Sequence, residues 1–337
     1  MAFAEPKFFG ISNIMNIIEF ISVYGIMSCG MLFVVLIGGL DLSVGRMAAL
    51  SGAVTCVISM AGHFSTFSMI LGLLASIAVA VVFGLLHGFM VTKVGMPAFV
   101  VTLASSYLMY GLIPAICGGS RAYVKAGTLL DMISNYRVFE IQLASGKLFV
   151  FSLRSLIFII FAVICWFILS KTTFGRRIYA IGGNPTAAEF VGIKVFKNTC
   201  AAYIICAIGA SIGGLLLMSS ASYAAQTIAA GYEGTVLMAL IVGGINLAGG
   251  KGNISGAIFG ALLVGIISNI VNLSSFLNSD YMKFFQGLII LIVVIISTML
   301  EIRSRRGKGR KAKAIAEMQA EAEVEEAEAK EKEKEIE

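Results

Sequence analysis

Charged residues are scarce in this sequence of 337 residues, and the scarcity excludes most classes of protein. Only 13% of the residues are charged and 58% are apolar, whereas soluble domains average roughly 25% charged and 45–50% apolar residues. Residues 303–337 hold ten of the 25 Lys/Arg and ten of the 19 Asp/Glu, which leaves 15 and 9 for residues 1–302. So few charges cannot cover a water-soluble surface, and a disordered chain would need low hydrophobicity. The composition therefore predicts an all-α polytopic membrane protein.

The sequence also lacks the motifs that accompany metal or nucleophilic chemistry. It has no Cys-x-x-Cys pair and no H-E-x-x-H, and its only histidines are His63 and His87. We therefore predict no catalytic residue, no metal site, no cofactor and no enzymatic activity. The net charge of +6 is attributed to membrane orientation and not to a nucleic-acid partner. The cysteines are expected as small apolar residues within helices: Cys29, Cys56, Cys117, Cys165, Cys200 and Cys206.

Nine segments are long and apolar enough, or nearly so, to cross a bilayer, which takes about twenty residues in a helix. Two of them, 46–61 and 235–249, are short and adjoin Gly-rich breaks. Such interruptions are tolerated where a helix is buried in protein or lines a pathway. The sequence thus predicts about nine transmembrane helices within a domain over residues 1–302, at 14–38, 46–61, 67–91, 96–117, 149–170, 198–219, 235–249, 254–272 and 281–300.

Basic residues near the segment ends predict the orientation, because Lys and Arg accumulate in cytoplasmic loops. The loop 171–197 carries five basic residues against Glu189, and the stretch 303–313 carries seven and no acid. Both are expected in the cytoplasm. The N-terminus and the loop 118–148 then lie outside, although that loop also has more basic than acidic residues. The tail 303–337 should begin against anionic lipid headgroups and continue as a solvated helix or a disordered segment.

The first motif is GGLDLSVG, between the first two spans. Gly38, Gly39 and Gly45 interrupt the helix, and Asp41 or Ser43 could cap the helix that follows. A carboxylate this close to the hydrocarbon is costly and usually has a function. A helix cap at the cytoplasmic boundary and a functional acid both remain open.

The second motif is GGINLAGGKGNISGAIFGALLVG, which begins at Gly243. It misses the spacing of a phosphate-binding loop, so it is not a nucleotide site. Its later part has the G-x-x-x-G spacing that lets helix backbones approach closely, as do Gly84/Gly88 and Gly209/Gly213. We interpret its glycines as structural: Gly243, Gly244, Gly249, Gly250, Gly252, Gly256 and Gly260.

The third motif is the basic loop 171–197. Gly182, Gly183, Asn184 and Pro185 predict a turn, and the proline can open a short amphipathic helix that ends at Gly192. Such a helix could lie on the membrane or dock into a partner protein.

Taken in this order, the three motifs resemble those of permease subunits of bacterial ABC importers for simple sugars, the group that includes the ribose, galactose and xylose permeases. The resemblance covers nearly all of residues 10–302. It implies the bacterial plasma membrane, a separate ABC ATPase subunit, an extracytoplasmic sugar-binding protein and a second permease chain, identical or homologous. It also implies that the third motif couples to the ATPase, through Gly183, Asn184, Pro185, Thr186, Ala187, Ala188, Glu189 and Gly192.

The chain departs from this family in several places. Family members usually have about ten spans and one more helix upstream, Arg46 replaces a small residue, and Thr235 stands where an Asp is usual. The Glu/Lys-rich tail is not a family feature.

The leading hypothesis is a sugar permease that works by alternating access. A permease for amino acids or nucleosides is the alternative, and an intramembrane enzyme a remote one. Polar residues near the span ends are the candidates for the pathway, although helix–helix hydrogen bonding explains each of them too: Ser219, Ser220, Tyr223, Gln226, Glu233, Asn246, Asn269 and Asn272.

Overall fold

The structure, a computed structural model, describes residues 10–142 and 148–273 together with isolated positions between 284 and 299. The last predicted span, 281–300, lies mostly outside the described residues, and the tail 303–337 lies wholly outside them. The elements described below all belong to one compact unit, Met1–Gln286.

Six helices of the described part are long and apolar enough to cross a membrane. They coincide with the first six predicted spans and are α1 (Ile11–Leu36), α2 (Val44–Ala61), α3 (Thr66–Phe89), α4 (Ala98–Ile116), α6 (Leu153–Lys171) and α9 (Val195–Ala221). A π-helical turn, η1 (Met90–Val94), extends α3. The expectation at 235–249 needs correction, because α10 (Tyr232–Val242) ends where Gly243 and Gly244 begin a loop and is too short to cross alone. The segment at 254–272 forms α11 (Ile254–Leu273).

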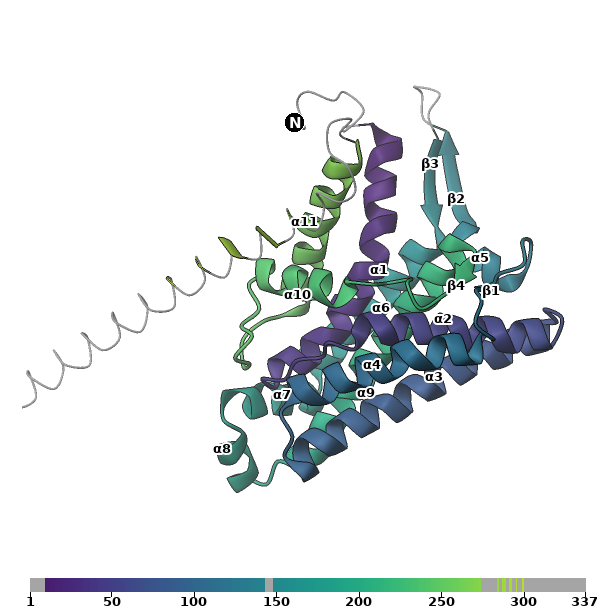
Figure 1. Cartoon of the computed structure of the whole chain (residues 1–337). Helices are drawn as coiled ribbons and strands as arrows, with labels where there is room; N and C mark the ends of the chain where they lie inside the picture. Colours follow the sequence, from purple (N-terminus) through teal and green to yellow (C-terminus); the bar gives the residue numbers. More distant parts are fainter. Residues whose placement is uncertain are drawn as a thin grey trace, which may run out of the picture. The chain divides into compact units, whose positions relative to one another are not determined.

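The long helices α1 and α9 form the centre of the unit (Figure 1). They run antiparallel, because Gly209 lies against Gly30, whereas Gly213, one turn further along α9, lies against Val23. Most of α1, α2 and α9 is buried, whereas α3, α4 and α6 expose most of their residues. Apolar residues on that outer layer need lipid or protein to cover them.

Glycines let the helices of this centre approach one another closely. Gly84 and Gly88 of α3 face the backbone of α9 at Ile204 and Cys200, where a side chain would collide. Gly256 and Gly260 of α11 face α10 in the same way. Gly252, the first glycine of that predicted stripe, precedes α11 and belongs to the loop. Backbone contacts of this kind are how helices associate where water supplies no hydrophobic drive.

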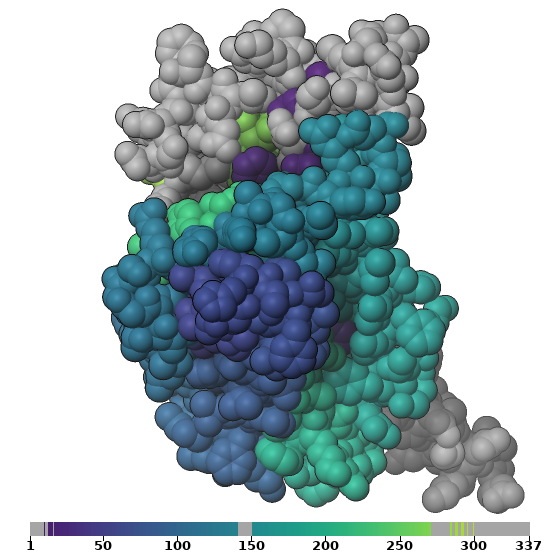
Figure 2. Space-filling model, turned by 90° about the vertical axis from the view of Figure 1, so that its right-hand side faces the viewer, coloured from purple at the N-terminus to yellow at the C-terminus, as the bar shows by residue number. Residues whose placement is uncertain are grey.

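The predicted loop 118–148 contains secondary structure that its composition did not indicate. Strand β1 (Ala122–Tyr123) pairs antiparallel with β4 (Tyr223–Ala224), and helix α5 (Leu129–Asn135) follows it. Strands β2 (Arg137–Gln142) and β3 (Leu148–Ser152) form a hairpin that lies beside the N-terminal half of α1, at the end of the unit away from α8 (Pro185–Phe190) (Figure 1). In Figure 2 the dark-blue turn between α2 and α3 points toward the viewer below these segments.

We predict that Gly256→Leu impairs assembly of the protein. A Cβ atom at this position would lie 2.5 Å from the Gly243 carbonyl oxygen, so α10 and α11 would have to separate. Overpacking of this kind costs about 1–3 kcal/mol or more. The yield of monodisperse protein in detergent and its thermal midpoint should both fall. Gly111→Leu is the control, because Gly111 has open space around it, and equal behaviour of the two variants would contradict the packing role.

Candidate functional site

The three glycine-rich motifs meet at one junction. Gly182, at the end of helix α7 (Thr173–Gly183), lies against the carbonyl of Leu36 and the backbone of Gly250. The Gly250 N–H donates a hydrogen bond to the Leu36 carbonyl at 2.8 Å, and Gly249 lies beside the Gly38 nitrogen. The end of α1, the end of α7 and the loop before α11 are therefore held together backbone to backbone.

Tyr179 strengthens this junction from α7. Its hydroxyl donates a hydrogen bond of 2.7 Å to the carbonyl of Gly252. Partial burial raises the pKa of the Tyr179 phenol above its ordinary value, so the hydroxyl keeps the proton that it donates. A displacement of α7 would therefore move the loop 243–253 with it.

The short helix α8 (Pro185–Phe190) begins directly after the junction, as the sequence predicts. The Asn184 side chain accepts from the Ala187 N–H at 3.0 Å, and Pro185 occupies the first turn. The left-handed backbone of Gly192, with φ of +82°, follows its end. The turn expected over 182–185 needs correction, because Gly182 and Gly183 are the last residues of α7.

The outer surface of α8 is apolar. Ala188 is buried, whereas the side chain of Phe190 is 87% exposed and that of Val191 just after it 77% exposed. Two neighbouring apolar side chains this exposed, between basic flanking segments, are typical of a surface that a partner covers.

Asp41 is buried among helices, with only 1% of its surface exposed. Its Oδ1 accepts from the Ser43 N–H at 2.8 Å and from the Ser43 hydroxyl at 2.6 Å. Its Oδ2 lies 3.5 Å from the Cys206 Sγ and 3.9 Å from the His87 Nδ1. Ser43 is the N-cap residue of α2, but neither its side chain nor that of Asp41 accepts from an N–H of that helix, so the expected side-chain cap is wrong. The carboxylate instead folds the DLS turn (residues 41–43) onto itself and contacts α3 and α9.

The same contacts place the GGLDLSVG motif deeper than a membrane boundary. Cys206 follows Lys197, the sole charged residue of α9, by nine residues, which corresponds to about 13 Å along a helix. The acid therefore lies well inside the apolar part of α9. α2 consequently begins within the bundle, and Gly45 in its first turn lies against Ala229 and Glu233.

Several predicted pathway residues make structural contacts instead. Asn269 of α11 and Asn13 of α1 exchange two hydrogen bonds, of 2.8 and 2.9 Å, and so join these helices. Asn246 accepts from the Ala248 N–H within its own loop, and the Tyr223 ring lies under Arg121 in the β1–β4 segment. Ser219 accepts from the Ser134 N–H of α5 at 2.9 Å. The side chain of Asn272 lies outside the described part of the chain.

Two polar cavities lie on either side of the start of α10. The larger, of about 460 Å³, is lined by Glu233 together with residues of α2, α4 and the DLS turn. Gln226 does not line this cavity, but its backbone carbonyl accepts a 2.7 Å hydrogen bond from Arg46, which does. The cavity residues are Leu42, Arg46, Leu103, Ser106, Tyr107, Tyr110 and Glu233.

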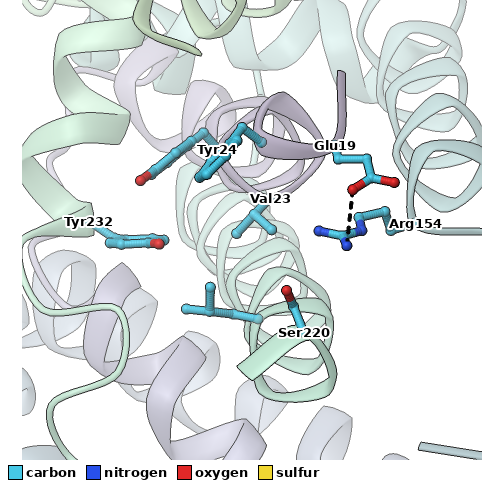
Figure 3. A pocket seen from close by; sticks show the side chains of 8 residues that line it. Glu19, Val23, Tyr24, Arg154, Ser220 and Tyr232 are labelled. Atoms are coloured by element: carbon cyan, nitrogen blue, oxygen red, sulfur yellow. Dashed lines mark ion pairs between the residues drawn. The ribbon is translucent and has the colours of Figure 1, made fainter. Parts of the chain in front are cut away.

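The second cavity, of about 240 Å³, lies between α1, α6, α9 and α10. Arg154 forms an ion pair of 3.2 Å with Glu19 on one side of it, and the tyrosines of α1 and α10 lie across from that pair (Figure 3). The rings of Tyr24 and Tyr232 are 4.7 Å apart, and Ser220 borders the same space.

Sequence reasoning named Glu233 and Ser220 but missed most of the lining of both cavities. Glu19 and Arg154 gave a signal, because charged residues inside an apolar stretch usually face a cavity or one another. Arg46 was noticed only as a departure. Tyr107 and Tyr110 lie in the inner part of α4 and were not singled out from the sequence.

We predict that Asp41→Ala destabilises the protein more than Asp41→Asn. Alanine leaves the buried Ser43 N–H and hydroxyl without their acceptor, at about 1–3 kcal/mol for each unsatisfied group. Asparagine retains one oxygen that can accept both. The thermal midpoint of the purified protein measures the difference, and equal midpoints would show that the turn does not depend on this acceptor.

Comparison with known proteins agrees with the family resemblance that the three motifs indicate. The family model described as "Branched-chain amino acid transport system / permease component" matches residues 13–294. The ribose import permease protein RbsC of Escherichia coli (strain K12) is 33% identical over 293 residues, which are 87% of this chain and 88% of that protein. The RbsC protein of Bacillus subtilis (strain 168) is 32% identical, with 87% of each chain covered.

A third relative, the L-arabinose transport system permease protein AraH of Escherichia coli (strain K12), is 32% identical over 86% of this chain and 84% of its own length. No solved structure matches. The six apolar helices fit a multi-pass protein of the inner membrane. With a match that spans 13–294 and relatives of this similarity over most of their length, the chain belongs to the family of ABC-importer permeases that this model describes.

Proposed function

We propose that the chain is the membrane-spanning subunit of a binding-protein-dependent ABC importer for a simple sugar. Its partners would be an ABC ATPase, an extracytoplasmic sugar-binding protein and a second permease chain. The family membership supports the transport role, and the names of the relatives support a monosaccharide. The observation that carries the proposal is the exposed apolar pair at the end of α8, beside the junction of the three motifs.

The junction suggests how ATP hydrolysis elsewhere would move this chain. An ATPase that closes and pulls on α8 would displace α7, because Asn184 alone separates the two helices. Gly182 and Tyr179 would pass that displacement to the Leu36 carbonyl and to the loop 243–253. α10 borders both polar cavities and α1 borders the smaller one, so the motion would change access to them. This is alternating access driven from the cytoplasmic side.

The orientation that this mechanism needs puts α8 in the cytoplasm and the loop 118–148 outside. Impermeant thiol labelling of intact cells tests it with two exposed positions, Ala126→Cys and Thr186→Cys. We expect labelling at 126 and none at 186 until the cells are opened. A further cysteine at Ala320 should behave like that at 186, because the basic stretch 303–313 favours the cytoplasm. Labelling of 186 in intact cells would overturn the orientation.

A permease for amino acids or nucleosides is the second candidate. The family model is described by a branched-chain amino acid system, and this description favours the amino acid branch of that candidate. The sugar permease and this second candidate share the same membrane architecture, so only measurements of substrate uptake separate them.

Uptake in a strain without this gene decides between the candidates. We expect uptake of one of three labelled sugars, D-ribose, D-allose or L-arabinose, to fall at least tenfold at low micromolar concentration. The gene on a plasmid should restore it. L-leucine and uridine uptake are the controls and should not change. Loss of leucine or uridine uptake with normal sugar uptake would reject the sugar proposal.

Phe190→Ala tests the coupling role of α8. The side chain is exposed in the isolated chain, so its removal should leave insertion and thermal stability unchanged. We expect co-purification of the ATPase and sugar uptake to fall together, by tenfold or more, because the apolar anchor is lost. Met132→Ala, an exposed apolar residue of α5 at the other end of the unit, is the control. Unchanged sugar uptake in Phe190→Ala would contradict the coupling role of α8.

A further inference from the structure

The larger cavity has the composition of a small-molecule site. A guanidinium (Arg46), a carboxylate (Glu233), a hydroxyl (Ser106) and two phenol rings (Tyr107 and Tyr110) line about 460 Å³ of space. They come from three helices, α2, α4 and α10, that are far apart in the sequence. A concave space with a few convergent polar groups and aromatic walls is the usual form of a ligand pocket.

The two charged side chains of this cavity do not pair with one another. Among the described residues no ion pair joins Arg46 to Glu233, and the Oε2 atom of Glu233 is buried without a hydrogen-bond partner. A buried carboxylate oxygen without a partner is destabilising, because it has lost its hydrogen bonds to water and formed none within the protein. The second cavity differs here, because Arg154 and Glu19 already pair at 3.2 Å.

Two contacts fix the guanidinium of Arg46 and leave some of its N–H donors free. One nitrogen, Nη1, donates to the Gln226 carbonyl at 2.7 Å, and the guanidinium lies 4.7 Å from the centre of the Tyr110 ring. A guanidinium has five N–H donors in a planar fork, so these two contacts fix its plane and leave other donors available. Its position therefore does not depend on Glu233.

The cavity opens where α4 is exposed. Tyr107 is 72% exposed and Tyr110 is also exposed, on a helix whose residues are mostly uncovered in the single chain. Ionisable groups within a bilayer almost always face protein or a water-filled space, because lipid cannot solvate them. The outer surface of α4 beside Arg46 therefore meets protein or water and not the hydrocarbon.

We propose that this cavity is a low-affinity contact site for a neutral, polyhydroxylated solute on its way through the membrane. One hydroxyl of the solute would donate to the Glu233 carboxylate, another oxygen would accept from the free donors of Arg46, and the C–H face of the ring would lie on Tyr107. The charges cancel within the site, which suits a neutral solute. This inference rests on the proposed function and adds where the substrate is contacted.

A thiol-protection experiment tests the site without needing transport. Ser106→Cys places a reporter in the wall of the cavity, and Leu108→Cys places a control on the same helix outside the lining. The purified chain in nanodiscs is treated with a cationic methanethiosulfonate. The unmodified chain gives the background, because five of the six native cysteines are buried.

We expect D-ribose, D-allose or L-arabinose at high millimolar concentration to slow modification at 106 at least threefold and to leave 108 unchanged. Glu233→Gln should abolish that protection, because the carboxylate acceptor is gone. If Glu233→Gln fails to fold, Tyr107→Ala serves instead, since this exposed side chain is not needed for packing. It should weaken protection to less than half.

The outcomes separate the two proposals. Equal modification rates with and without every sugar overturn the site, whatever the uptake measurements give. Protection by L-leucine and not by a sugar also overturns it, because a zwitterion would then be the ligand of the two charges. A strain without this gene that keeps sugar uptake overturns the proposed function, whereas sugar-dependent uptake without protection at 106 leaves that function standing and removes only the site.

Discussion

The backbone contact at the end of α1 is the constraint on which the other features depend. The Leu36 carbonyl has no partner in a following turn of helix, because the chain leaves α1 at Gly38. A carbonyl in that position must be satisfied by protein where lipid surrounds the bundle. The N–H of Gly250 satisfies it, and Gly182 packs over the same atom. Because three segments meet at one carbonyl, a movement of any of them has to be accommodated by the other two.

The interrupted helices obey the same requirement, that protein groups satisfy the backbone hydrogen bonds. A membrane helix can stop at depth only where neighbouring segments take over its hydrogen bonds and cover its polar side chains. The DLS turn meets this need internally, with Asp41 as the acceptor for Ser43, and α10 begins against α2 at Gly45. Both polar cavities reach one of these breaks, the start of α10, and their other walls include the uninterrupted helices α1 and α4.

The sequence was sufficient for what depends on composition and spacing. Six long helices, the short helix after Pro185 and the close approach at Gly84 and Gly256 all agree with the structure. These features are local, because each follows from one run of residues. The length of α10, the helix α7 and the pairing of β1 with β4 were not predictable, because contacts with distant segments decide them. For the same reason Glu233 was recognised as a candidate, whereas its neighbours in the cavity were not.

The short length of α10 has a consequence for how the protein is made. Eleven residues of helix span about 16 Å, half of a hydrocarbon layer of about 30 Å. Such a segment gains too little from lipid to enter the bilayer by itself. It can settle at depth only together with α11, whose Gly260 packs against it, and only after α2 offers Gly45 as a surface. Insertion of this chain is therefore ordered, and its first half serves as the template on which the second half completes its entry into the membrane.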